Sequence, residues 1–219
     1  MNRATRITVA TLGIVFAVSG LSHGFFEVLQ GNTPTEGMFI SAIGEAHRMW
    51  PHGNEYAFTL IPNFLVTGIV AMLIGLLIII WSVGFVHTRR GPSVFLLLFV
   101  LLLLTGGGVA QVIFFPLTWA VATRINKPLT WWRKVLRGRL RAVLSRLWPW
   151  LLAAGALLMV MTLQVATTGF VPGVDDPDAA LNVMLVCLAG GLTSILLTYV
   201  AGFAYDIERQ VETAGPAAG

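Results

Sequence analysis

The amino-acid sequence predicts an all-helical, polytopic integral membrane protein, on the evidence of its composition, its long apolar stretches and its uneven charge. Of its 219 residues, 56% are hydrophobic and only 11% are charged, whereas charged residues make up about a quarter of a typical soluble domain. Eight of the fourteen Lys and Arg residues lie between Arg124 and Arg146, between two apolar stretches. Because cytoplasmic loops collect Lys and Arg, we expect this segment and the C-terminus on the cytoplasmic side of the plasma (inner) membrane.

Five stretches are apolar enough to be embedded in a bilayer, where a spanning helix needs about 20 apolar residues. They are residues 7–29, 57–86, 94–123, 149–170 and 179–205. Little chain remains for a separate soluble domain, so residues 1–207 are expected to form one transmembrane helical domain. The tail, residues 208–219, is expected to be disordered. The first stretch resembles a secretory signal in its two preceding arginines, but its apolar run is long enough to favour an uncleaved span.

The third stretch is interrupted by three consecutive glycines, residues 106–108, the strongest break in any apolar stretch of the chain. It also lies between two basic segments, Arg89 with Arg90 and residues 124–146, which one ordinary span cannot both place in the cytoplasm. A re-entrant hairpin with its tip at the glycines would put every Lys and Arg inside except Arg48. A single tilted span would instead put the N-terminus and the Arg89–Arg90 turn outside. Non-helical backbone at membrane depth must be shielded from lipid, so both arrangements stay open.

Residues 130–147 place apolar side chains at helical spacing, with basic side chains on the other faces. We expect a cytoplasmic amphipathic helix at the membrane interface. Its cations would contact anionic phospholipids, each adding about 1 kcal/mol of binding free energy; they are Arg133, Lys134, Arg137 and Arg141. The segment 30–56 carries one Arg and three Glu, so we expect it outside, with short helical or irregular structure between residues 39 and 50.

Polar residues inside apolar stretches are the default candidates for a functional site in a membrane protein. His23 and Glu27 lie four residues apart, hence on one face of the first predicted span, and Gln30 continues that face. With Gln111, which follows the three glycines, they form the predicted site for a ligand or a proton. The alternative is structural: an interfacial hydrogen-bonded pair at His23 and Glu27, and an interhelical hydrogen bond at Gln111.

A metal site is the second hypothesis, because imidazole and carboxylate groups are metal ligands. It would combine His23 and Glu27 with His47 and His52 of the segment 30–56, which also carries Glu55. This hypothesis corresponds to a membrane-embedded, metal-dependent enzyme with an outward-facing His/Glu site.

No motif in the sequence names a reaction. Residues 20–24 match G-x-S-x-G, but the nucleophile elbow needs a preceding strand, and two glycines at this spacing favour close helix packing instead. Haem, nucleotide and flavin motifs do not occur, so the sequence predicts no cofactor. We therefore expect a non-catalytic function, either passage of a small solute or ion or a role as accessory subunit of a membrane complex. The expected partners are the bilayer, a second copy or a membrane subunit, and no nucleic acid.

Overall fold

The computed structural model describes residues 1–214, apart from the side chains of Ala110, Gln111 and Ala214. The described chain is mostly helical and contains four helices that are long and apolar enough to cross a membrane. They are α1 (Arg3–Leu29), α2 (Phe64–Gly84), α6 (Gly138–Thr168) and α7 (Pro177–Ala214). This composition is consistent with the predicted helical membrane protein.

The remaining elements are short. Between α1 and α2, a connecting segment (residues 30–63) contains strands β1 (Phe39–Ser41) and β2 (Tyr56–Phe58) and the 3-10 helix η1 (Glu45–His47). The third apolar stretch forms α3 (Gly91–Leu104), the 3-10 helix η2 (Ala110–Ile113) and α4 (Phe114–Ala122). A last short helix, α5 (Thr130–Val135), precedes α6.

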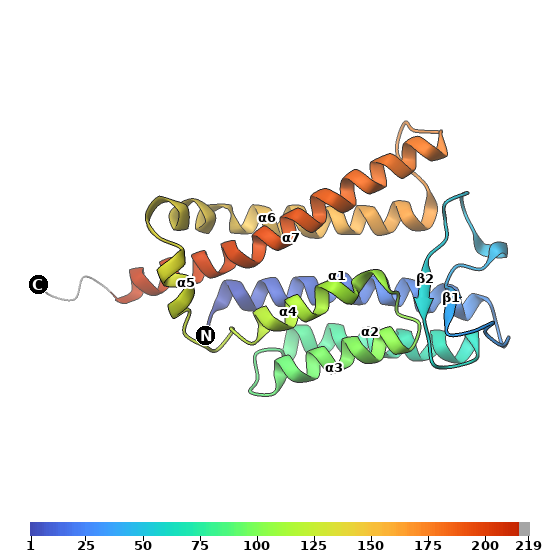
Figure 1. Cartoon of the computed structure of the whole chain (residues 1–219), viewed down its shortest axis with the longest axis horizontal. Coiled ribbons are helices and arrows are strands. Elements are labelled where there is room, and N and C mark those ends of the chain that lie inside the picture. Colours follow the sequence, from blue (N-terminus) through green and yellow to red (C-terminus); the bar gives the residue numbers. More distant parts are fainter. Residues whose placement is uncertain (215–219) are drawn as a thin grey trace, which may run out of the picture.

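The helices form two groups that lie along each other, α1 to α4 in one and the α6–α7 pair in the other (Figure 1). Helix α1 is central, because it contacts α2 and α4 on one side and α6 and α7 on the other. Glycines let α1 and α2 approach closely: a Cβ atom on Gly24 would lie 2.7 Å from the carbonyl oxygen of Gly68. The glycines of residues 20–24 therefore serve helix packing inside α1, and no strand precedes them.

The third apolar stretch folds back on itself. The Asn126 side chain donates a hydrogen bond of 2.6 Å to the His87 carbonyl oxygen, so the residues before α3 and after α4 lie together. The reversal occurs at the glycine tip (residues 105–109), where Gly106 and Gly108 have φ angles of 97° and 91°, values that favour glycine. Of the two arrangements that the sequence left open, the chain path is that of the hairpin.

The backbone of the glycine tip is bonded to neighbouring elements. Gly106 N–H donates to Phe58 O at 2.9 Å, and Leu60 N–H donates to Leu104 O at 2.9 Å. The Thr67 hydroxyl of α2 donates to the Thr105 carbonyl at 2.8 Å. These bonds satisfy groups that an interrupted helix exposes, which is the condition for irregular backbone at membrane depth.

Within residues 39–50, η1 and irregular backbone agree with the expected short helical or irregular structure, whereas strand β1 does not. β1 pairs antiparallel with β2, with Phe39 opposite Phe58, and only η1 is helical. The strand was not expected from the sequence, because strand pairing depends on a partner later in the chain.

The predicted amphipathic helix over residues 130–147 is also wrong as a single element. α5 ends at Val135, Leu136 is extended at its C-terminus, and Gly138 has a φ of 52°. Residues 138–147 instead form the first turns of α6, which continues through Pro149. The fourth predicted stretch, residues 149–170, is thus the later part of a longer helix.

The C-terminal boundary differs too. α7 runs to Ala214, so residues 208–214 of the predicted disordered tail are helical, and the prediction for residues 215–219 lies outside the described residues.

Candidate functional site

The site is built on α1 near its C-terminal end. His23 and Glu27 are both buried there, on the one face that their four-residue spacing predicts. The Nε2 atom of His23 lies 2.6 Å from Oε2 of Glu55, which precedes β2, and the two side chains are 7% and 18% exposed. The connecting segment therefore places the Glu55 carboxyl group against the His23 side chain of α1.

The glycine tip covers both residues. A Cβ atom on Gly108 would lie 2.7 Å from Nε2 of His23, and one on Gly106 would overlap the Glu27 carboxyl group. Any larger residue at these two positions would collide with the site, in addition to the strain of positive φ. The three glycines and the His23–Glu27 pair, which the sequence presents as separate features, thus meet at one place.

Glu27 lies in an environment without opposite charge. Its side chain is fully buried, and among the described residues neither carboxyl oxygen has a hydrogen-bond partner. Helices α2, α3 and α4 contain no Asp, Glu, Lys, Arg or His. A buried polar group without a partner costs free energy, so a group of this kind on the central helix is a strong functional candidate.

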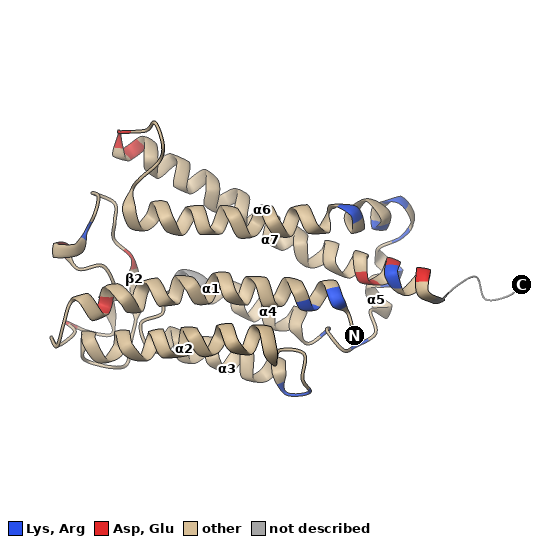
Figure 2. Cartoon of the chain, turned by 180° about the vertical axis from the view of Figure 1, so that it is seen from behind, with Lys and Arg blue, Asp and Glu red and all other residues tan. Residues whose placement is uncertain are grey.

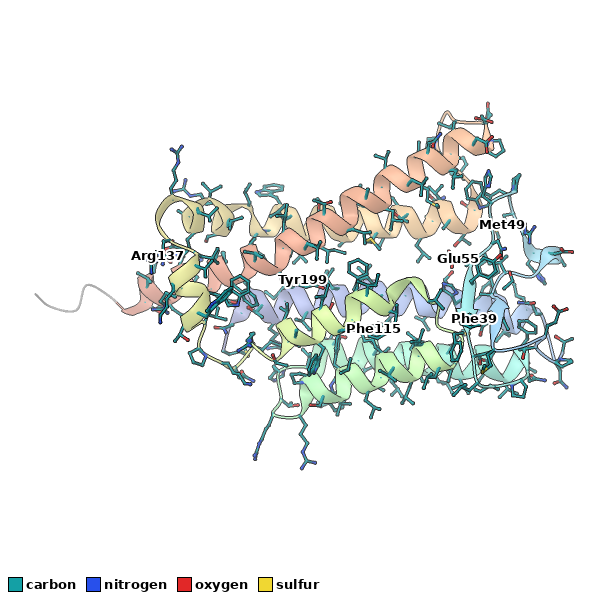
Figure 3. The ribbon with its side chains drawn as sticks, in the orientation of Figure 1. Phe39, Met49, Glu55, Phe115, Arg137 and Tyr199 are labelled. Atoms are coloured by element: carbon teal, nitrogen blue, oxygen red, sulfur yellow. The ribbon has the colours of Figure 1, made fainter. Side chains whose placement is uncertain are left out.

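A cavity of about 530 Å³ adjoins this pair. Its walls come from α1, α4, α6 and α7 and are mainly apolar, including Phe16, Met159 and Leu188. One end is polar; there the lining residues are His23, Asn54, Glu55 and Tyr56. Figure 3 shows Glu55 between the α6–α7 pair and the group of α1 to α4.

The connecting segment bridges the two helical groups at this end. The Trp50 indole N–H donates a hydrogen bond of 2.9 Å to the Ala166 carbonyl of α6, and its ring packs with Val165 and Ala180. His52 Nε2 lies 2.9 Å from Oδ1 of Asp178 on α7. The segment therefore contacts α1 through Glu55 and the α6–α7 pair through Trp50 and His52.

The other predicted site residues lie elsewhere. Gln30 donates hydrogen bonds to the Ser41 and Ala42 carbonyls at 3.0 and 2.8 Å, which positions the connecting segment. His47 lies in η1, and the side chain of Gln111 is outside the described residues. The structure does not bring His23, Glu27, His47 and His52 into one metal site: within residues 1–214, no three His, Cys, Asp or Glu side chains form a group that could hold a metal ion.

The predicted lipid-contact residues lie at the basic end, the end that holds the N-terminus, the end of α7 and most Lys and Arg residues (Figure 2). Arg141 pairs with Glu208 at 2.7 Å, and Arg133 donates to the Gln210 side chain at 2.7 Å. Lys134 and Arg137 are exposed. Contact of these residues with anionic lipid stays a prediction.

Sequence reasoning missed the cavity and the contribution of Trp50 and Tyr56. The cavity walls come from helices far apart in the chain, so no local pattern indicates them. The sequence partly indicated Glu55 as a site residue, because its carboxyl group is close in sequence to two histidines in the same expected loop.

Fold and site together define a helical protein of the membrane type, with a buried histidine–carboxylate cluster beside an apolar cavity. Comparison with known proteins adds no family: no family model, curated protein or solved structure matches the chain.

Proposed function

We propose that this chain is a multi-pass plasma-membrane protein that binds a small, mainly apolar solute in the cavity beside His23 and Glu55, as a step in its passage. The observation that carries this proposal is the cavity, whose volume of about 530 Å³ falls within the range of small-molecule sites. The mainly apolar walls favour a solute with an apolar body over a bare ion. The polar end would bind one hydrogen-bonding group of that solute.

The charge distribution supports the orientation. The bond between Asn126 and His87 places the Arg89–Arg90 turn beside the start of the segment 124–146. Arg3 and Arg6 begin α1 at the same end, where Arg6 donates to the Val83 carbonyl at 3.3 Å. By the positive-inside rule, this basic end is cytoplasmic, α3 and α4 form a re-entrant hairpin, and the connecting segment lies outside.

The depth of the cavity fits uptake from the outer side. Its lining runs from Asn54 and Tyr56 in the connecting segment to Val15 on α1. Val15 lies about 20 Å along α1 from Leu29, at a rise of about 1.5 Å per residue. The cavity thus reaches from the outer end to the middle of the bilayer, as expected for a solute site in a protein that moves its substrate.

The test is photolabelling of the full-length protein in lipid nanodiscs with a diazirine derivative of a medium-chain alcohol. Peptide mass spectrometry should find adducts on the cavity residues Met159, Met184 and Leu188. Ala166→Trp fills part of the cavity, and overpacking of this kind costs about 1–3 kcal/mol, so labelling at these residues should fall about tenfold.

The matched control is Ala153→Trp, because Ala153 is an exposed alanine of the same helix that does not line the cavity. This variant should label like the parent protein. Labelling confined to outward-facing residues such as Leu157 and Val186, or equal loss in both variants, would contradict solute binding in the cavity.

No observation favours the metal-dependent enzyme, since the described part of the chain groups no three metal-ligand side chains. The role of accessory subunit stays an untested prediction.

A further inference from the structure

The Glu27 carboxyl group is a buried titratable group that the proposed function leaves unexplained. It is fully enclosed, neither oxygen has a partner among the described residues, and the glycine tip lies directly against it. The proposed solute does not account for it, because Glu27 does not line the cavity.

The groups that face Glu27 restrict its chemistry. On α1 the titratable residue one turn away is His23, and the His23 ring pairs with Glu55 of the connecting segment. Helices α2, α3 and α4 supply no titratable side chain, and neither does the glycine tip. An ionised carboxylate without a counter-charge in such surroundings would cost many kcal/mol, whereas the carboxylic acid would cost only a few. The environment therefore suits a carboxyl group that carries a proton.

A route for that proton leads from the cavity. Glu55 and His23 both line the cavity, and they are in contact through His23 Nε2. The other ring nitrogen, Nδ1, is buried without a partner among the described residues. Imidazole can accept a proton on one nitrogen and release one from the other. His23 and Glu27 are one helical turn apart, with Cβ atoms separated by about 5–6 Å, a distance that their side chains can span.

We propose that Glu27 is a proton-binding site, loaded from the cavity through Glu55 and His23. Glu55 takes a proton from a hydronium ion in the cavity, which leaves water, and transfers that proton to His23 Nε2, which restores the Glu55 carboxylate and gives an imidazolium. The imidazolium then transfers its Nδ1 proton to the ionised Glu27 carboxylate, which leaves a neutral ring protonated on Nε2. One proton is thereby moved from the cavity to Glu27. This site stands on Glu27 and its neighbours, whatever solute the cavity binds.

Infrared spectroscopy of the full-length protein in nanodiscs tests the site directly. At neutral pH, the difference between wild type and Glu27→Gln should contain the carbonyl-stretch band of a protonated carboxyl group. The control Glu45→Gln removes an exposed carboxyl group of η1 and should leave that band in place. Absence of the band from the Glu27→Gln difference spectrum would overturn the proposal, because Glu27 would then be ionised.

The route is tested by the rate at which that band shifts after transfer into D₂O. His23→Gln and Glu55→Gln should each slow deuteration of the Glu27 carboxyl group by about tenfold or more, while Glu55→Asp should restore much of the rate. His52→Gln removes a nearby histidine that pairs with Asp178 instead, and it should have no effect. Unchanged rates in both His23→Gln and Glu55→Gln would contradict the route. Because no ligand is added, these results and the photolabelling can fail separately.

Discussion

At the scale of single residues, Asp206 shows how the basic end is held together. It lies buried on α7, yet its carboxylate caps the N-terminus of α1. It accepts hydrogen bonds from the backbone N–H groups of Ala4 at 2.9 Å and Thr5 at 2.8 Å, and from the Thr5 hydroxyl at 2.7 Å. The residue before the helix, Asn2, provides no side-chain cap of its own. A distant carboxylate thus fills the place of a local cap and also favours the helix dipole.

Asp206→Ala should therefore destabilise the protein. Two buried N–H groups would lose their acceptor, and hydrogen bonds to a charged group contribute about 1.5–3 kcal/mol each, so a loss of about 3–6 kcal/mol is expected. Thermal unfolding of the detergent-solubilised protein, followed by circular dichroism, measures the loss. Asp175→Ala, which removes an exposed carboxylate from the turn before α7, should leave the midpoint unchanged. Equal midpoints for Asp206→Ala and the parent protein would show that the cap contributes nothing.

Part of the candidate site could be predicted from individual residues and their spacing. The shared face of His23 and Glu27 followed from helical periodicity alone. The pairing of His23 with Glu55, rather than with His47 or His52, did not, because it depends on how the connecting segment folds over α1. A two-stranded sheet sets that path, and strand pairing is not encoded in the local spacing of one segment.

At the scale of elements, the long apolar stretches predicted the main helices, and the glycines predicted the break in the third stretch. The helix boundaries could not be predicted in this way. The stretches of α1, α2, α6 and α7 are recognisable because hydrophobicity over about 20 residues is a strong signal. The break at residues 106–108 could be predicted because glycine tolerates backbone conformations that interrupt a helix. In the structure, Gly106 and Gly108 adopt positive φ. The boundary between α5 and α6 was missed, since the spacing of apolar residues predicted one helix over residues 130–147, whereas the chain bends at Leu136 and Gly138.

The hairpin of α3 and α4 predicts that its two ends lie on the same side of the membrane. In a background of Cys187→Ala, single cysteines at Thr88 and Thr130 should both resist a membrane-impermeant maleimide in intact cells and react after permeabilisation. Both positions are exposed, and the reversal of the chain puts them on the same side. Glu36→Cys, in the connecting segment, should react in intact cells. Labelling of Thr88→Cys from outside would contradict the re-entrant arrangement and favour a single crossing.

At the scale of the whole molecule, the two helical groups are joined by separate sets of contacts at their two ends. At the basic end, Asp206 binds α1, and the Trp148 indole N–H donates to the Thr8 hydroxyl at 2.9 Å. Near the middle, the hydroxyl groups of Thr118 on α4 and Tyr199 on α7 lie 2.6 Å apart. At the cavity end, the connecting segment makes the join through Trp50. The cavity lies between the groups on that side, so Trp50 is placed to control how far they separate there.

Trp50→Ala should loosen the cavity end and leave the basic end intact. Replacing a buried Trp by Ala costs about 3–5 kcal/mol of stability. Here the lost contacts are those between the connecting segment and the α6–α7 pair. Hydrogen–deuterium exchange should therefore rise in residues 42–57 and 165–181 and stay unchanged in residues 1–9 and 199–210. Trp150→Ala is the matched control, because Trp150 is 74% exposed on the same α6 helix and contributes to neither join. A uniform rise in exchange over both ends would show that the groups separate as one unit, and the cavity could not then open independently of the basic end.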